Sequence, residues 1–233
     1  MVPETRRSTL RQDPWLERVE EGVDACDVLS WSGGKDSFLA LVAMANEAKR
    51  DVVLLTTFDG RSGQVAHQEV HIDEIRAQAR RLSVSLLLVP LYPGNDYQER
   101  VTTALQLLSA QRPIRRFAFG DLHLEHVREW RIEHFGTALN ELGVEPHFPV
   151  WKIPYLELET MFFDSGATAT VSAVADPGLA TVCAVGDAFT SDWLNLLPED
   201  VDRFGENGEF HTFVTPPDMS WRNLASASKS EGV

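Results

Sequence analysis

The feature that most constrains the fold of this chain is the stretch DVLSWSGGKDSF at residues 27–38. Its apolar first half predicts a buried strand, and the sequence that follows it predicts a helix. Two glycines stand between them, and glycine permits both positive φ angles and a close approach of the backbone to a ligand. The first N–H groups of a helix have no intrahelical partner and carry partial positive charge, so this turn predicts an anion site.

The side chains of the turn indicate that the anion is a nucleotide phosphate. Serine hydroxyls can donate to phosphate oxygens, and a lysine adds a point charge. Asp36 suits such a site if Mg²⁺ lies between its carboxylate and the phosphates, held through water. The predicted ATP-binding residues of this loop are Ser32, Gly33, Gly34, Lys35, Asp36 and Ser37.

Two common phosphate loops do not match this stretch. A Walker A loop ends in Gly-Lys-Ser or Gly-Lys-Thr, whereas Gly34-Lys35 is followed by Asp36, and Leu29 stands where the first glycine belongs. The chain also lacks the Gly-x-Gly-x-x-Gly pattern of dinucleotide folds. An ordinary strand-to-helix turn, with Ser32 or Asp36 as the N-cap, is the structural alternative.

Strands and helices alternate along residues 28–151. This order predicts βαβ units, and hence an α/β fold with a doubly wound, parallel, five-stranded sheet of the Rossmann-like type. Ligands of such sheets bind beyond the carboxyl ends of the strands. The predicted strands are residues 28–31, 51–58, 84–91, 116–120 and 147–151, and the predicted helices are residues 38–50, 71–82, 97–108 and 127–142. Four segments lie at those ends and predict one nucleotide cleft: residues 32–37, Thr57-Phe58, Tyr92-Pro93 and Gly120-Asp121.

The pattern changes after Trp151 and predicts a second, smaller α/β lobe. Within that lobe we expect a helix at residues 156–164, strands at 167–174 and 181–185, and a helix at 192–197. The expected divisions of the chain are an N-terminal arm at residues 1–25 with a short helix at 15–22, a nucleotide-binding domain at 26–149, the C-terminal substrate lobe at 150–217, and a tail at 218–233 that is disordered from 226.

Composition narrows the class of protein. A hydrophobic share of 43% and a charged share of 24% are typical of a soluble globular protein, and no apolar run is long enough to span a bilayer. The first residues lack the apolar core of a signal peptide, so we expect a cytoplasmic protein with no membrane partner. A net charge of −14 disfavours nucleic acid as a partner, because nucleic-acid binding needs a basic face. Whether the chain forms a homo-oligomer stays open.

Cysteine and histidine give no pattern for a structural metal centre. Cys26 and Cys183 are too few for a disulfide framework or a zinc site, and each is expected to be a small core residue. His67 and His71 have the i, i+4 spacing of a zinc-binding pair, but the sequence offers no third ligand.

A second group of chemically active residues stands in the stretch GENGEFHT at residues 205–212. It brings two carboxylates, an imidazole and a hydroxyl together around two glycines. Asn207-Gly208 is also a favoured type I′ turn, so a plain hairpin with a strand on each side explains the stretch as well.

Together the two stretches resemble those of the diphthine–ammonia ligase family, within the PP-loop superfamily of ATP pyrophosphatases. The superfamily carries an SGGxDS loop, here Ser32–Ser37, and the family carries a C-terminal Gly-Glu-x-Gly-Glu-[Phe/Tyr]-Glu-Thr signature, here residues 205–212. A Gly-Asp after the fourth strand matches Gly120-Asp121, and the Pro-Leu-Trp of the domain junction resembles Pro149-Val150-Trp151. The resemblance covers about residues 27–215.

One position departs from the family pattern. Where archaeal and eukaryotic members have a further glutamate, this chain has His211. The phrase GENGEFHTF resembles a bacterial branch of the family, and bacteria lack diphthamide. The resemblance therefore implies a chemistry without naming the acyl substrate.

The implied chemistry is that of an ATP-dependent amide ligase. The loop would hold the β,γ-pyrophosphate while a substrate carboxylate attacks the α-phosphorus, and ammonia would then convert the acyl adenylate into an amide. The implied ligands are ATP, Mg²⁺, ammonia and an unidentified carboxylate. Glu206 and Glu209 would bind or deprotonate ammonium, and His211 would act as an acid or base near neutral pH. The implied catalytic residues are Lys35, Asp36, Glu206, Glu209 and His211, with Asp36 as the water-mediated magnesium ligand.

The resemblance also implies where the remaining groups bind. The backbone at Thr57-Phe58 would receive adenine, and Gly120-Asp121 would approach the ribose or the α-phosphate. The implied substrate-binding residues are Trp151, Gly205, Glu206, Asn207, Gly208, Glu209 and Thr212.

Other functions remain open at this stage. A different PP-loop activity, such as tRNA thiolation or lysidine formation, is disfavoured by the acidic charge and by the lack of a catalytic cysteine pair. A glutamine-dependent synthetase is disfavoured because no glutaminase segment with a cysteine nucleophile is present, so free ammonia or a partner would supply the nitrogen. A nucleotide-binding or sensing module without turnover is the alternative from another class.

Overall fold

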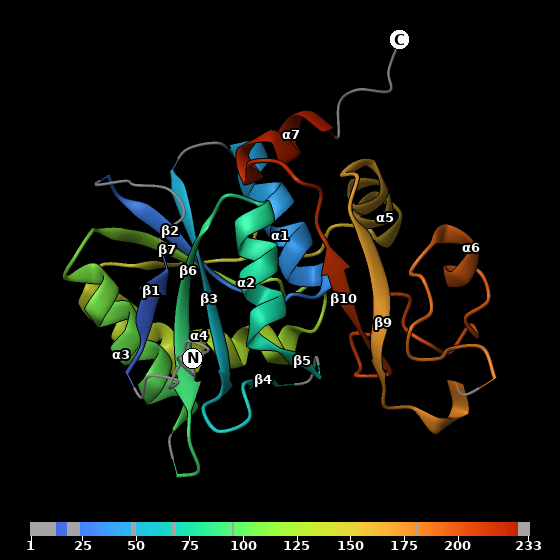
Figure 1. The fold of residues 1–233 in the computed structure, drawn as a ribbon, viewed down its shortest axis with the longest axis horizontal. Coiled ribbons are helices and arrows are strands. Elements are labelled where there is room, and N and C mark those ends of the chain that lie inside the picture. Colours follow the sequence, from blue (N-terminus) through green and yellow to red (C-terminus); the bar gives the residue numbers. More distant parts are fainter. Residues whose placement is uncertain are drawn as a thin grey trace, which may run out of the picture.

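The computed structural model describes residues 13–17, 24–47, 50–66, 69–94, 96–179 and 181–227. Within these residues the chain forms an α/β fold around a six-stranded sheet, as the alternating pattern predicts (Figure 1). Five of its strands are parallel, and β1 lies antiparallel at the edge, beside β6. In sheet order the strands are β1 (Trp15–Glu17), β6 (Ser85–Leu91), β3 (Asp51–Asp59), β2 (Cys26–Ser30), β7 (Ile114–Ala118) and β8 (Glu145–His147).

The central strands are covered on both faces, which explains their continuous apolar sequence. Successive residues of a strand point to opposite faces, and in β3 Leu54 joins one buried cluster while Val53 and Leu55 join the other. The sheet is therefore doubly wound, as predicted. The first cluster includes side chains of α1 (Lys35–Glu47) and α2 (Ile72–Arg81), and the second includes side chains of α3 (Tyr97–Ser109) and α4 (Glu125–Leu142).

The edge of the sheet differs from the sequence prediction. A helix is predicted at residues 15–22, but residues 15–17 are strand β1, and residues 18–22 lie outside the described part of the chain. The strand pairs with Leu86, Leu87 and Leu88 of β6, and Trp15 packs edge-on against Phe58 with 5.8 Å between ring centroids. Pairing with a sheet edge thus outweighs the local helical pattern, and it covers backbone groups that would otherwise be open.

The C-terminal part of the chain packs on the α1 side of the sheet (Figure 1). Helix α5 (Tyr155–Asp164) and strand β9 (Thr168–Val174) form as predicted, and β9 pairs antiparallel with β10 (Phe210–Thr215). Helix α6 (Ser191–Leu194) is shorter than the helix predicted at residues 192–197. The remaining short elements are β4 (Gln64–Val65), β5 (Val70–His71), η1 (Pro177–Leu179), η2 (Trp221–Asn223) and α7 (Leu224–Ala227).

Two local predictions are wrong, and the structural alternative for residues 205–212 is not found. Residues 181–185 form turns in place of a strand, although Cys183 is buried there as expected. Asn207-Gly208 does not join a hairpin, because β10 pairs with β9 and residues 202–208 before it form turns. The last strand of the sheet, β8, ends at His147, where the predicted strand begins, because the chain turns at residues 149–152.

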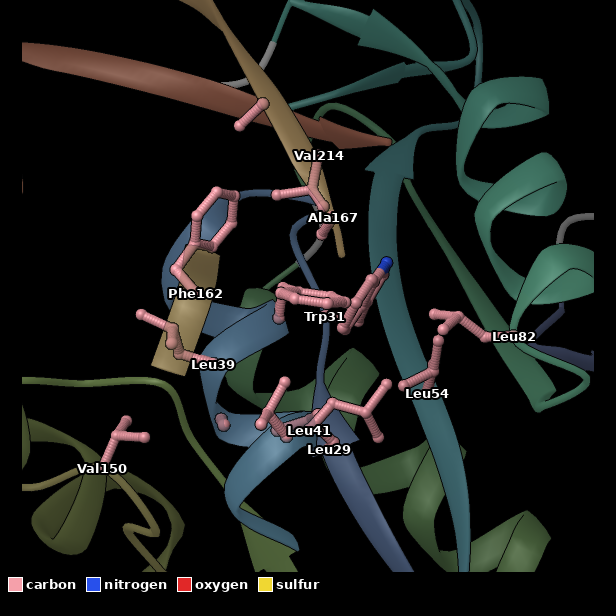
Figure 2. Packing of buried hydrophobic residues seen from close by; sticks show 14 of the residues in the cluster. Leu29, Trp31, Leu39, Leu41, Leu54, Leu82, Val150, Phe162, Ala167 and Val214 are labelled. Carbon is pink, nitrogen blue, oxygen red and sulfur yellow. The ribbon is translucent and has the colours of Figure 1, made fainter. Parts of the chain in front are cut away.

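A single buried cluster joins the sheet to the C-terminal part. In Figure 2, Trp31 lies at the centre, with Leu54 of β3 on one side and Phe162 and Val214 on the other. The side chain of Trp31 is 2% exposed, and its indole N–H donates to the Gln78 side chain at 2.9 Å. The predicted division at residue 150 stays a prediction, but no break in the core marks it among the described residues.

Residues 218–227, expected to belong to a tail, are part of the packed structure. Trp221 and Leu224 are buried, and the Trp221 N–H donates to the carbonyl of Leu82 at 2.7 Å. The remainder of the predicted tail, residues 228–233, lies outside the described part of the chain. Of the helices in the described residues, none combines the length and the apolar character needed to cross a bilayer.

Candidate functional site

Two cavities open at the carboxyl ends of the parallel strands. Cavity A has a volume of about 350 Å³, and cavity B has a volume of about 290 Å³. Arg131 of α4 lines both of them, so the two cavities adjoin. Cavity A is lined by Ser30, Trp31, Ser32, Leu55, Thr57, Val65, Ala66, Leu91, Tyr97 and Arg131. Cavity B is lined by Gly34, Lys35, Asp36, Gly120, Asp121, Leu124, Val127, Arg131, Gly205, Glu206, Gly208, Phe210, His211 and Thr212.

The loop at residues 32–37 connects β2 to α1 and contributes to both cavities. Gly33 has φ +83°, and a Cβ there would lie 2.6 Å from Ile75 Cδ1, so only glycine suits this position. The Ser37 hydroxyl donates to the Gly34 carbonyl at 2.9 Å, and the Gly34 N–H donates to the Ser32 hydroxyl at 3.3 Å. The predicted strand, glycine turn and helix start are all present.

Gly120 allows the segment after β7 to lie against the start of α1. A Cβ on Gly120 would stand 2.8 Å from the Asp36 carbonyl carbon and 2.9 Å from the Ser37 backbone nitrogen. Those neighbours are backbone atoms, which cannot turn away as a flexible side chain can. The Gly-Asp dipeptide singled out in the sequence therefore belongs to the wall of cavity B, beside the loop at residues 32–37.

The buried Lys35 and the partly buried Asp36 form an ion pair within the loop. The Lys35 Nζ lies 3.1 Å from Asp36 Oδ2 and 5.5 Å from the centroids of both the Phe204 and the Phe210 rings. Burial raises the pKa of Asp36 against the opposing effect of Lys35, and the negative charge of Glu206 raises it further. Asp36 Oδ1 is buried and makes no hydrogen bond within the described residues.

Asp121 and Arg131 form a second ion pair at the junction of the two cavities. The Arg131 Nε lies 3.5 Å from Asp121 Oδ2, and neither atom makes a hydrogen bond within the described residues. Burial raises the pKa of Asp121, although the charge of Arg131 opposes the shift. Cavity B therefore holds two aspartates whose pKa is raised by burial although each has a cationic partner.

Asp36 Oδ1 and Asp121 Oδ2, which make no hydrogen bond within the described residues, could serve as ligands of a hydrated cation. Asp36 and Asp121 both line cavity B, and carboxylate oxygens are the ligands that Mg²⁺ takes from proteins. The described residues hold no group of three or more His, Cys, Asp or Glu residues arranged for a metal ion. The donor set thus suits Mg²⁺ that arrives with phosphate and water ligands. As for the i, i+4 spacing of His67 and His71, His67 lies outside the described residues, and His71 Nδ1 accepts from the Asp73 N–H.

Thr212 connects the C-terminal stretch to the loop at residues 32–37. Its hydroxyl oxygen accepts a hydrogen bond from the Lys35 backbone N–H at 3.2 Å, and the residue is 1% exposed. Lys35 is the first residue of α1, so its N–H has no partner inside the helix. The stretch at residues 205–212 is therefore brought to the helix start by β10, as the pairing of the two sequence motifs predicts.

Glu206 fastens the C-terminal stretch to the segment after β7. Its carboxylate accepts hydrogen bonds from the Leu122 N–H at 3.1 Å and from the His123 N–H at 3.0 Å. The hydroxyl of Tyr155 donates to Glu206 Oε2 at 3.3 Å. Glu206 lines cavity B as expected, but its oxygens are already engaged by these donors, which makes it a brace of the cavity wall.

Six residues of the predicted site do not line either cavity: Gly33, Ser37, Phe58, Trp151, Asn207 and Glu209. Glu209 accepts hydrogen bonds from the Asp202 N–H and the Asn207 side chain, so both Glu209 and Asn207 serve the loop itself. Phe58 is buried against Trp15 because alternate residues of β3 face opposite sides, whereas Thr57 does line cavity A. Trp151 packs against Phe148, Arg128 and Lys152, outside both cavities.

The structure adds residues that the sequence did not reveal. Asp202 Oδ1 accepts from the N–H groups of Phe204 and Glu206, and its other oxygen accepts from the Tyr155 hydroxyl. Burial raises the pKa of Tyr155, so it remains a hydrogen-bond donor. Neither Asp202 nor Arg131 stands in a recognisable motif. Only the apolar periodicity around Arg131 indicated that α4 exists at all.

The comparisons with known proteins do not identify a family. No protein-family model and no curated protein matches this chain. One solved structure that it resembles is described as a predicted subunit of a tRNA methyltransferase from Methanocaldococcus jannaschii. The sequence identity is 16% and the TM-score 0.45, and the match covers 82% of this chain and 97% of that chain. A likeness at this level does not extend to function.

Proposed function

We propose that this protein is a PP-loop ATP-binding enzyme that adenylates a carboxylate and transfers the acyl group to ammonia. The observation that carries the proposal is the hydrogen bond from the Lys35 N–H to Thr212, because it joins the phosphate loop to the C-terminal signature. Glu206 supports it by fastening the same signature to the segment that follows Gly120-Asp121. Every motif that carries the family resemblance, apart from the Trp151 junction, thus contributes to cavity B.

The two cavities suit different parts of an ATP molecule. Cavity A, with Leu55, Thr57 and Tyr97 in its lining, suits a nucleoside, since it is the less charged of the two. Cavity B contains the start of α1 and Lys35, which suit the β,γ-pyrophosphate. The α-phosphate would then lie between them.

The proposed reaction has two steps. A carboxylate oxygen of the substrate attacks the α-phosphorus, the bond from that phosphorus to the β-phosphate bridging oxygen breaks, and pyrophosphate leaves. Ammonia then attacks the acyl carbon, the bond to the AMP oxygen breaks, and an amide forms. The nitrogen must release a proton, and His211, which lines cavity B, would take it. Lys35 and the first N–H groups of α1 would stabilise the charge of the leaving pyrophosphate.

Magnesium has a place in this scheme. Asp36 and Asp121 would hold it, since each offers a buried carboxylate oxygen without a hydrogen bond in the described residues. When bound, Mg²⁺ would neutralise part of the phosphate charge and so favour the departure of pyrophosphate.

The amide-forming step is tested by following nitrogen. The full chain would be incubated with ATP, Mg²⁺, ¹⁵N-labelled ammonium and a small-molecule cell extract, and the products examined by mass spectrometry. The proposal predicts an amide that gains one ¹⁵N atom only when both ATP and wild-type protein are present. Formation of AMP without any ¹⁵N product would refute amide formation and favour another PP-loop activity. Nucleotide binding without any conversion would favour a sensing module.

A further inference from the structure

We infer that Arg131 binds the α-phosphate of the nucleotide and stabilises the charge that develops on it during adenylation. This inference rests on the proposed function, because it needs a nucleotide that spans the two cavities. Arg131 is the residue common to the linings of cavities A and B. A group placed there meets the part of ATP that joins the nucleoside to the pyrophosphate, which is the α-phosphate.

The guanidinium of Arg131 is held in place by aromatic rings. Its central carbon lies 5.1 Å from the centroid of the Phe119 ring and 5.4 Å from that of Trp130. Phe119 is buried and follows β7 directly, so one side of this arrangement is anchored in the core. A planar cation stacked in this way loses little further freedom when it binds an anion, and its fork of N–H groups matches a phosphate.

The hydrogen-bonding capacity of Arg131 is not used up by its own neighbours. The Nε atom is buried, makes no hydrogen bond within the described residues, and stands 3.5 Å from the Asp121 carboxylate. Asp121 thus supplies a counter-charge to Arg131 without closing a hydrogen bond to that atom. The terminal N–H groups of the same guanidinium are the donors that would meet an oxygen of the α-phosphate in the cavities that Arg131 lines.

Arg128, one helical turn before Arg131 on α4, provides a matched control. It also stacks on two aromatic rings, with 5.0 Å to Phe148 and 5.2 Å to Trp151, and its Nε is likewise buried without a hydrogen bond in the described residues. It differs in two respects, because Arg128 lines neither cavity and the ion pair with Asp121 belongs to Arg131. Any effect that arises merely from losing a stacked arginine on this helix should therefore appear in both variants.

The test compares the binding of AMP and of adenosine by calorimetry, which requires neither the acyl substrate nor turnover. AMP carries the α-phosphate and adenosine does not. Wild type should bind AMP more tightly than adenosine by about tenfold or more, since a charge-assisted arginine–phosphate contact contributes at this level. Arg131→Gln should lower that ratio about tenfold while adenosine affinity stays within about threefold, and Arg128→Gln should keep the wild-type ratio.

The outcomes separate the inference from the proposed function. If wild type binds ATP and Arg131→Gln keeps the wild-type preference for AMP, Arg131 does not hold the α-phosphate and the inference is overturned. If wild type binds neither ATP nor adenosine, the proposed function itself fails. Because Arg131→Gln leaves Asp121 buried without its cation, thermal melting would accompany the titrations. Should that variant be unfolded, the double variant Asp121→Asn/Arg131→Gln, which removes both charges, replaces it with the same expected loss.

Discussion

The backbone N–H of Lys35 donates a hydrogen bond to the hydroxyl of Thr212, 177 positions away in the chain, and both residues are almost completely buried. One group belongs to the loop at residues 32–37 and the other to the C-terminal stretch at residues 205–212. The contact makes the start of α1 depend on the position of β10. The loop is therefore held in part by the last strand of the described residues.

Replacing Thr212 by valine tests this dependence. Valine keeps the shape of threonine but leaves the Lys35 N–H without its acceptor, so the free energy of unfolding should fall by about 1–2 kcal/mol. Denaturant unfolding measures the change. Thr215→Val, at an exposed position of the same strand, is the control and should change stability by less than about 0.5 kcal/mol. Equal effects of the two variants would contradict a special role for Thr212.

Gly120→Ala should destabilise the protein by about 1–3 kcal/mol or more, because the added Cβ would stand 2.8 Å from backbone atoms of Asp36. The same change at Gly136, inside α4, meets no atom within 4 Å and should stabilise by about 0.5–1 kcal/mol through helix propensity. Thermal unfolding of both variants gives the comparison. A stable Gly120→Ala variant that still binds ATP would show that the close contact with the loop is unnecessary.

The Glu206→Gln variant tests whether Glu206 has a structural role or takes part in proton transfer. Because the carboxylate accepts N–H groups of Leu122 and His123, an amide in its place should lower stability by about 1–3 kcal/mol and weaken nucleotide binding. Glu129→Gln, at an exposed position of α4, should leave both properties unchanged. If Glu206→Gln loses turnover while its stability and ATP affinity match those of wild type, Glu206 takes part in the chemistry itself.

The free energy of unfolding should depend on pH because of Glu47, which lies at the C-terminal end of α1, away from the loop at residues 32–37. Partial burial opposes its ionisation, but hydrogen bonds from Arg116 and His147 outweigh burial and lower the pKa of Glu47 below the ordinary 4.5. A carboxyl whose pKa is depressed by folding contributes stability above its unfolded pKa and loses it as the pH falls through the folded pKa.

The measurement is the stability of wild type and Glu47→Gln as a function of pH. The variant should be less stable by about 1 kcal/mol at about pH 6, allowing for solvent screening of this partly exposed group. The difference should shrink as the pH falls below 4.5. A difference that stays constant down to the acid transition would show that the Glu47 charge contributes nothing.

The sequence predicted the parts of the fold that depend on local pattern. Buried parallel strands such as β3 and β6 are continuous apolar runs, and they were found where expected. Strand β1 could not be recognised, because three residues become a strand only through pairing with β6. Residues 181–185 are apolar as a strand would be, yet they form turns in which Cys183 is buried, Val182 packs against the core and Val185 is exposed.

At the candidate site, too, features that depend on local sequence were predictable and features that depend on tertiary packing were not. The conformation of the loop at residues 32–37 was predictable because its glycines and the helix start are contiguous in sequence. The sequence could not show which carboxylates line the cavity and which accept hydrogen bonds from backbone N–H groups. Glu209 was therefore expected to line cavity B, but it accepts a hydrogen bond from the Asp202 N–H and does not line that cavity. Arg131 and Asp202 reach the site through the packing of α4 and of the turns before β10, which no local pattern records.

The most direct test of this account is to determine which bond of ATP is broken. ATP labelled with ³²P at the α-phosphate would be incubated with the full chain, Mg²⁺, ammonium and a small-molecule cell extract, and the labelled nucleotide separated by chromatography. The account predicts labelled AMP from wild type, dependent on the extract, and none from Asp36→Asn, which keeps the shape of the side chain but removes its charge. Labelled ADP as the product, abolished by the same substitution, would contradict the account.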